Sequence, residues 1–145
     1  MKKILLATAA VGLFFTACKK DDNLPSTTNT WRVGANTRTA TSVTVTQTTL
    51  SATDNNNGIT VTFGSTIPTT DGKFRIVGGT PAAGEIAITV TEGSALNAYH
   101  TTGLDNKEAN VTVNSNKVAV KVPDVWAKNL LGTDSLLISA DLRQP

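Results

Sequence analysis

Apolar and polar side chains alternate with a period of two along most of the chain after residue 30. In seven segments an apolar residue recurs at every second position, and the residues between are polar or small except Leu137; the segments are 42–46, 59–63, 73–76, 85–90, 110–114, 117–122 and 135–142. A period of two places alternate side chains on opposite faces of a β-strand, one toward a core and one toward water. The 25 threonines agree with this, because their branched Cβ favours strands over helices. The pattern predicts an all-β, antiparallel sandwich of about 7–9 strands.

Two neighbouring segments define a hairpin whose register follows from the sequence. A two-residue turn at positions 115–116 places Val113 opposite Val118 and Val111 opposite Val120. All four valines then share one face. A shift of one residue would turn half of them toward water, so the sequence specifies this register.

Three other regions are assigned from local composition. Asparagine and glycine tolerate the positive φ of tight turns, so a second hairpin turn is predicted within Asp54–Gly58. Trp31–Val33 and Ala95–Thr102 are predicted as further strands. Val125–Leu131 lies between a proline and a glycine; we prefer an extended edge strand there, with a short helical turn as the alternative.

The start of the chain has a different pattern. Lys2 and Lys3 precede an apolar run at residues 4–17, and the only cysteine, Cys18, follows it. A helix needs about 20 residues to cross a hydrocarbon core, so this shorter run predicts a secretory signal peptide rather than a membrane span. Phe15-Thr16-Ala17-Cys18 resembles a bacterial lipobox, which implies cleavage after residue 17 and attachment of fatty acyl chains such as palmitate to Cys18. A free thiol after an ordinary signal peptide is the alternative.

Residues 18–30 are polar and lack apolar periodicity. They predict a flexible tether between the lipidated cysteine and one β domain, residues 31–145. Lys20, Asp21 and Asp22 resemble the surface-export signal of Bacteroidota-type lipoproteins. The resemblance implies an outer-membrane protein held by a lipid anchor and exposed at the cell surface, since two or more acyl chains bind a bilayer firmly.

Charge and composition restrict the partners and the chemistry. The chain has 13 basic and 11 acidic residues, and loss of Lys2 and Lys3 with the signal peptide leaves 11 of each. A neutral chain gives no reason to expect a nucleic acid partner. With one histidine and its one cysteine assigned to lipid, the sequence predicts no metal site, no cofactor and no catalytic residues. The histidine, His100, is interpreted as an ordinary strand residue on the face of Leu96 and Ala98.

Trp126 is the one aromatic residue that the pattern leaves free to contact a ligand. The phenylalanines of the β domain follow the core alternation, and Trp31 is assigned to the first strand. Loops around Asp71, Asp105 and Asp124 would complete a site around the Trp126 ring.

Short segments of the β domain resemble small uncharacterised lipoproteins of Bacteroidota type: Trp31–Gly34, Tyr99–Gly103, Asn116–Val118 and Ser139–Leu142. Asp134-Ser135-Leu136 matches an O-glycosylation pattern of exported proteins of that group, with an exposed strand start as the alternative for Ser135. The resemblance implies an immunoglobulin-like sandwich but no activity. We therefore expect a non-catalytic surface lipoprotein that serves as an interaction or structural module of the cell envelope, with another envelope protein as its partner. The alternative is a glycan- or small-ligand-binding accessory module that uses Trp126 and neighbouring loops.

Overall fold

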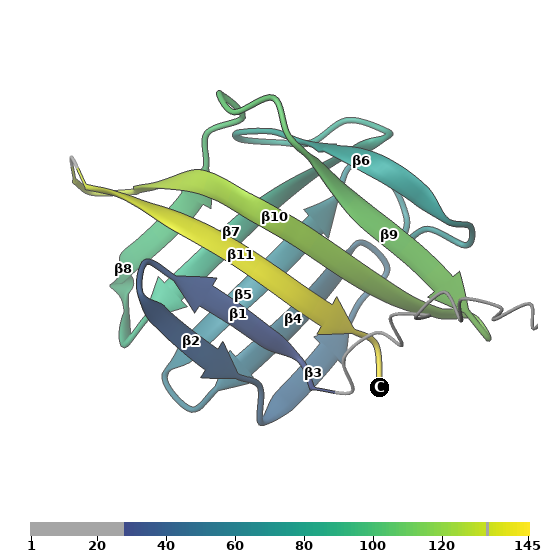
Figure 1. Cartoon of the computed structure of the whole chain (residues 1–145), viewed down its shortest axis with the longest axis horizontal. Helices are drawn as coiled ribbons and strands as arrows, with labels where there is room; N and C mark the ends of the chain where they lie inside the picture. The colour runs from purple at the N-terminus through teal and green to yellow at the C-terminus, as the bar shows by residue number, and fades with distance from the viewer. Residues whose placement is uncertain (1–27, 133) are drawn as a thin grey trace, which may run out of the picture.

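The computed structural model describes residues 28–132 and 134–145, and the regular structure within them is entirely β (Figure 1). The strands are β1 (Thr30–Val33), β2 (Asn36–Thr39), β3 (Ser42–Val45), β4 (Thr49–Asp54), β5 (Asn57–Phe63), β6 (Gly72–Ile76), β7 (Glu85–Glu92), β8 (Ser94–Thr101), β9 (Glu108–Asn114), β10 (Lys117–Asn129) and β11 (Ser135–Arg143). The all-β prediction is confirmed. The predicted number of about 7–9 strands is too low, because a short edge strand such as β2, with the sequence Asn-Thr-Arg-Thr, has no apolar residue and so no alternation.

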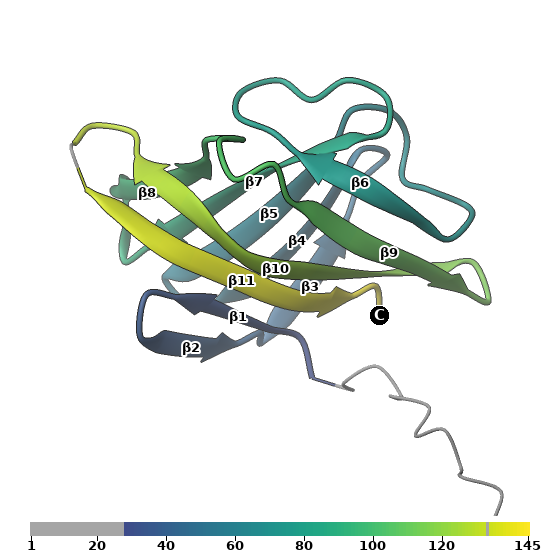
Figure 2. The same ribbon diagram turned by 45° about the horizontal axis from the view of Figure 1, so that its top comes forward.

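The eleven described strands belong to one hydrogen-bonded sheet. Its order is β2-β1-β11-β10-β9-β6-β7-β5-β4-β3, and β8 pairs with both β10 and β7. The pairs are antiparallel except for β6 with β7, which run parallel at Arg75–Glu85 and Ile76–Ile86. Figures 1 and 2 show the sheet folded over, so that β1, β11, β10 and β9 lie in front of β4, β5 and β7. The sheet is mixed, whereas the sequence predicts a purely antiparallel arrangement.

Strands β7 and β10 join the two layers because each divides one edge between two partners. On β10, residues 117–121 pair with β9 and residues 127–129 pair with β8. On β7, residues 85–86 pair with β6 and residues 89–92 pair with β8. The buried side chain of Thr101 fills the gap on β7: its hydroxyl donates to the Val77 carbonyl (2.6 Å) and accepts from the Ile88 N–H (3.2 Å). The Thr101 hydroxyl thus takes the place of a backbone hydrogen-bond partner at the point where β7 stops pairing with β6 and begins pairing with β8.

A single apolar core lies between the layers. Its largest fully buried side chains come from alternate strand positions and are Trp31, Leu50, Ile59, Ile86, Ile88, Ile138 and Leu142. Phe63 packs edge-on against Phe74, with ring centroids 5.7 Å apart, so both phenylalanines are core residues as the alternation predicts. Burial of each such side chain contributes about 1.5–3 kcal/mol to folding.

The predicted hairpin has the predicted register. Val113 lies opposite Val118 and Val111 opposite Val120, and the two turn residues at 115–116 have φ values of 52° and 63°. The second hairpin turns at residues 55–56, within the predicted Asp54–Gly58 segment. The extended form of 125–131 is confirmed as far as Asn129, where β10 ends. The prediction of an edge strand is wrong, because this part of β10 pairs with β11 on one side and with β8 on the other.

Candidate functional site

The candidate site lies on the outer face of β10, β11 and β1, and a β-bulge in β10 creates it. Val122 lies opposite Ala140 and Val125 opposite Ile138, so two residues of β10, Pro123 and Asp124, oppose one residue of β11. Unbroken alternation from Val122 would bury positions 124 and 126 and expose Val125. The extra residue instead keeps Val125 buried and turns positions 124 and 126 outward.

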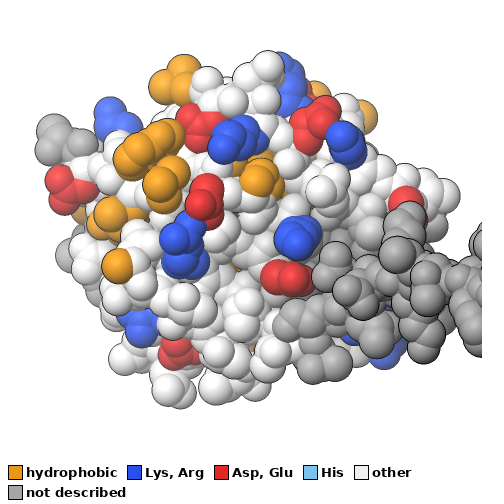
Figure 3. Space-filling model, in the orientation of Figure 1, with side chains coloured by type: hydrophobic (Ala, Val, Ile, Leu, Met, Phe, Trp, Pro, Cys, Tyr) orange, Lys and Arg blue, Asp and Glu red, His pale blue; other side chains and the backbone are white. Residues whose placement is uncertain are grey.

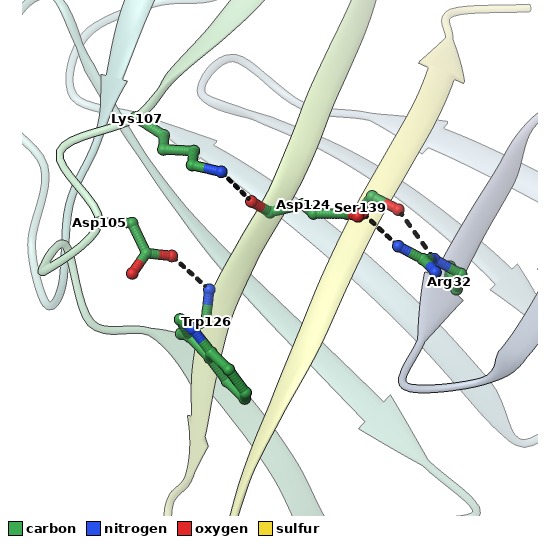
Figure 4. Close-up of polar contacts among 6 residues, drawn as sticks. All are labelled: Arg32, Asp105, Lys107, Asp124, Trp126 and Ser139. Carbon is green, nitrogen blue, oxygen red and sulfur yellow. Dashed lines mark hydrogen bonds and ion pairs between the residues drawn. The ribbon is translucent and has the colours of Figure 1, made fainter.

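Trp126 is the central aromatic group of this face. Its side chain is 48% exposed, and its backbone N–H donates to Asp105 Oδ2 (2.6 Å). Trp126 lies opposite Leu137 in the β10–β11 register, and Figure 4 shows the indole extending from β10 toward β11. The Asp105 contact fixes the loop after β8 beside this part of β10.

Close backbone packing fixes the other side of that loop. Gly103 has a φ of +73°, and a Cβ there would lie 2.9 Å from the Gly78 backbone nitrogen. A Cβ on Gly78 would lie 2.7 Å from the Thr102 carbonyl oxygen. Neither position has room for a side chain, so two glycines hold the loop with Leu104 and Asp105 in place.

A polar hollow lies on the same outer face, around Asp124, two residues before Trp126 on β10. It has a volume of about 390 Å³ and is lined by residues that include Arg32, Thr37, Lys121, Asp124, Ser139 and Asp141. Arg32 and Asp124 form an ion pair, and Lys107 Nζ donates to the Asp124 carbonyl oxygen (3.0 Å; Figure 4). The hollow therefore presents paired charges and hydroxyl groups on the face that also exposes Trp126.

The ion pair changes the protonation behaviour of both partners. The hydrogen bond from Arg32 lowers the pKa of the Asp124 carboxyl, and a hydrogen bond from Ser139 and the nearby charges of Arg32 and Lys107 act in the same direction. The hydrogen bond to Asp124 and its charge raise the pKa of Arg32. Asp124 therefore stays ionised to lower pH than an ordinary aspartate.

The structure brings some of the predicted site residues together. Asp105 and Asp124 flank Trp126, as the sequence predicts. Asp71 does not belong to this group, because its carboxylate accepts from the Val113 N–H (2.7 Å) at the far end of β9. The part of the prediction that placed the Asp71 loop in the site is wrong.

His100 lies on the outer face of β8, opposite Lys128 of β10 and Thr89 of β7. Its Nδ1 has no hydrogen-bond partner among the described residues. Within the same residues, no three His, Cys, Asp or Glu side chains are close enough together to hold a metal ion.

The remaining predicted positions are of two kinds. Ser135 is exposed at the start of β11, where both O-glycosylation and the plain strand-start alternative stay open. Cys18, Lys20, Asp21 and Asp22 lie outside the described residues.

Sequence reasoning missed several residues of this face. Arg32, Lys107 and Ser139 contact Asp124 or each other only because the sheet brings β1, β11 and the loop before β9 together. One signal was present in the sequence: the spacing of three between Val122 and Val125, in a run of valines spaced by two, marks the bulge.

The fold and site define a small all-β protein with an aromatic, charge-paired outer face. No family model matches the chain, and comparisons with curated proteins and with solved structures also gave no match. In the part of the chain that the structure describes, no helix has the length and apolar character to cross a membrane.

Proposed function

We propose that this chain is a non-catalytic lipoprotein, acylated at Cys18 and anchored in the outer membrane with its β domain at the cell surface. There the domain acts as an interaction module for another envelope protein. Support for the anchor comes from the order of basic residues, apolar run and Cys18, and from the Lys-Asp-Asp segment that follows. The observation that carries the interaction role is the outer face of β10 and β11, which combines the hollow lined by Arg32 and Asp124 with Trp126, a large apolar side chain left 48% exposed.

The two layers of the folded sheet are proposed to serve as an immunoglobulin-like sandwich scaffold. The alternating burial on the strands and the apolar core between the layers support this relationship. The two layers remain hydrogen-bonded to each other through β8 and β6, so the proposed sandwich is a single sheet folded over itself.

Metabolic labelling tests the anchor. Cells that express the chain are fed radiolabelled palmitate, and the label on the wild type is compared with that on Cys18→Ser. We expect label on the wild type only, with the wild type in the membrane fraction. Equal labelling of both would overturn the proposal.

Protease accessibility tests the outer face. Intact cells are treated with protease, and the loss of the full-length chain is measured by immunoblot. We expect the wild type to be degraded and a variant with Lys20, Asp21 and Asp22 changed to alanine to be acylated but protected. Protection of the acylated wild type would mean that the domain faces the periplasm, on the inner side of the outer membrane.

A second candidate function is a glycan- or small-ligand-binding accessory module. The observation that favours it is an exposed Trp126 ring on the same face as the hydroxyl and charged groups of the hollow, because a ring face packs on the apolar face of a sugar while polar groups bind its hydroxyls. A glycan array tests it, with Trp126→Ala as the loss variant and Trp126→Phe as a control that keeps a ring. Absence of binding by the wild type rejects this candidate.

A further inference from the structure

The large apolar side chains that remain exposed in the described residues gather in one region. They are Leu104 (86% exposed), Trp126 (48%), Leu130 (58%) and Leu131 (73%), called the Trp126 patch below. Leu104 adjoins Asp105, which binds the Trp126 backbone, and the other two leucines follow the end of β10. Figure 3 shows hydrophobic side chains gathered at the left of this face, toward the β10–β11 hairpin.

The chemistry of the patch is that of a lipid interface. Tryptophan favours the boundary between headgroups and acyl chains, where one edge of the ring is apolar and its N–H remains hydrated. The leucines protrude and have no hydrogen-bonding groups, so they suit acyl chains better than a sugar. Lys128, exposed on the same face of β10 as Trp126, can extend its charged end to the headgroups, and Lys107 adds a positive charge nearby while its Nζ donates to the Asp124 carbonyl. Asp105 and Asp134 balance those two charges, so attraction to anionic lipid is not required.

The position of β1 allows the anchor and the patch to reach the same bilayer. Trp126 lies opposite Leu137, whose carbonyl accepts from the N–H of Gly34 (2.8 Å) just after β1. Thr30 comes four residues earlier, so strand rise and two strand spacings put its Cα about 16 Å from that of Trp126. Asn29 is already hydrogen-bonded to the β domain, which leaves residues 19–28 as the connection; a chain of that length spans about 17 Å as a random coil and at most about 35 Å when fully extended.

We propose that the Trp126 patch lies in the interfacial layer of the bilayer that holds the lipid anchor, so that the β domain rests on the membrane in one orientation. The inference depends on the proposed acylation of Cys18. The anchor keeps the domain within a few nanometres of lipid, so even a modest apolar patch is held at the surface by its effective concentration. Lipid then covers the Trp126 ring, and the interaction with another envelope protein falls to the hollow lined by Arg32 and Asp124.

The two tryptophans of the chain provide the test. Trp31 is 1% exposed, whereas Trp126 is 48% exposed, so only Trp126 can meet a quencher in the membrane. The acylated wild type and Trp126→Phe are reconstituted in phosphatidylethanolamine–phosphatidylglycerol vesicles, with and without a lipid brominated on its acyl chain. We expect a roughly twofold fall in wild-type emission with brominated lipid, no fall for Trp126→Phe, and the same result at low and high salt.

Flotation of the vesicles separates failure of this inference from failure of the anchor. If the wild type floats with the vesicles but is not quenched, the patch faces away from lipid and the inference is overturned while the anchor stands. If it carries no acyl chain and does not float, both proposals fall. If it is unquenched and its emission changes on addition of an oligosaccharide, the patch serves the ligand-binding alternative instead.

Substitutions at exposed leucines test the patch without disturbing the core. Leu104→Ser and Leu131→Ser should fold normally and reduce the quenching of Trp126, because they remove apolar contact with the acyl chains. Ala83→Ser, at an exposed position in the loop after β6, is the matched control and should leave quenching unchanged. Unchanged quenching in both leucine variants would overturn the inference.

Discussion

The two halves of β10 follow the same alternation and serve different purposes. Before the bulge, residues 117–121 pair with β9, and the valines of Lys117–Val122 recur with an unbroken period of two and fill the core. After the bulge, residues 127–129 pair with β8, and Trp126 just before them is presented to the surface. The comparison teaches that one additional residue is enough to place an aromatic side chain outside while the core residues of the strand stay inside.

Single-residue deletions should separate the two halves most strongly. Deletion of Ala119 leaves no register in which Val118, Val120 and Val122 all face the core, so we expect a loss of more than about 4 kcal/mol or failure to fold. Deletion of Pro123 removes the extra residue, leaves Asp124 as the one outward residue and keeps Val125 opposite Ile138. We expect that variant to fold, with a loss below about 2 kcal/mol.

Urea unfolding followed by circular dichroism measures both deletions. The substitution Pro123→Ala, which keeps the bulge, serves as a control for the loss of the proline itself. If the Ala119 deletion reduces the free energy of unfolding no more than the Pro123 deletion does, the two halves of β10 do not differ in how strictly the core fixes their register.

Truncation of side chains compares the inward and outward faces. Val120→Ala leaves a cavity in the core and should reduce the free energy of unfolding by about 2 kcal/mol. Trp126→Ala removes a larger side chain but a half-exposed one, and should reduce it by less than about 1 kcal/mol. A larger loss for Trp126→Ala in the same urea titrations would mean that the ring supports the fold rather than a surface function.

The difference between the halves also explains how much could be predicted from the sequence. Alternation and a two-residue turn determine the hairpin around residues 115–116, and the observed register is the predicted one, since a slip would expose valines. The order of the strands depends on long-range pairing that no local pattern encodes, and so does the parallel pair β6–β7. The contacts of Asp124 with Arg32 and Lys107 join parts of the chain far apart in sequence, so they could not be predicted.

The attachment of the second half of β10 depends on β8, and Thr101 tests it. Thr101→Val keeps the shape of the side chain but leaves the Val77 carbonyl and the Ile88 N–H without their partner, so we expect a loss of about 1–3 kcal/mol. Thr112→Val, at an exposed position of β9 beside the first half, is the matched control and should change stability by less than about 0.5 kcal/mol. Amide hydrogen exchange should show faster exchange in β8 than in β9 for the Thr101 variant. Equal protection of the two strands would contradict the role assigned to Thr101.

The smallest effect is expected from the ion pair at the bulge, and it depends on pH. The pKa of the Asp124 carboxyl is lower in the folded chain than the ordinary value of 3.8, chiefly because Arg32 donates a hydrogen bond to it. Above that ordinary value the carboxyl is ionised in both states and its contribution to stability is complete; the contribution is lost as the pH falls through the lower folded pKa. The contribution is small because the side chains of Arg32 and Asp124 are both exposed to solvent, at 38% and 47%.

Asp124→Asn and Arg32→Gln should therefore flatten the acid side of the stability profile without changing its shape above pH 5. An NMR titration of the Asp124 carboxyl carbon should give a midpoint below 3.8. A midpoint at or above that value would show that the pair does not form in solution, and that the bulge holds Asp124 outward without help from β1.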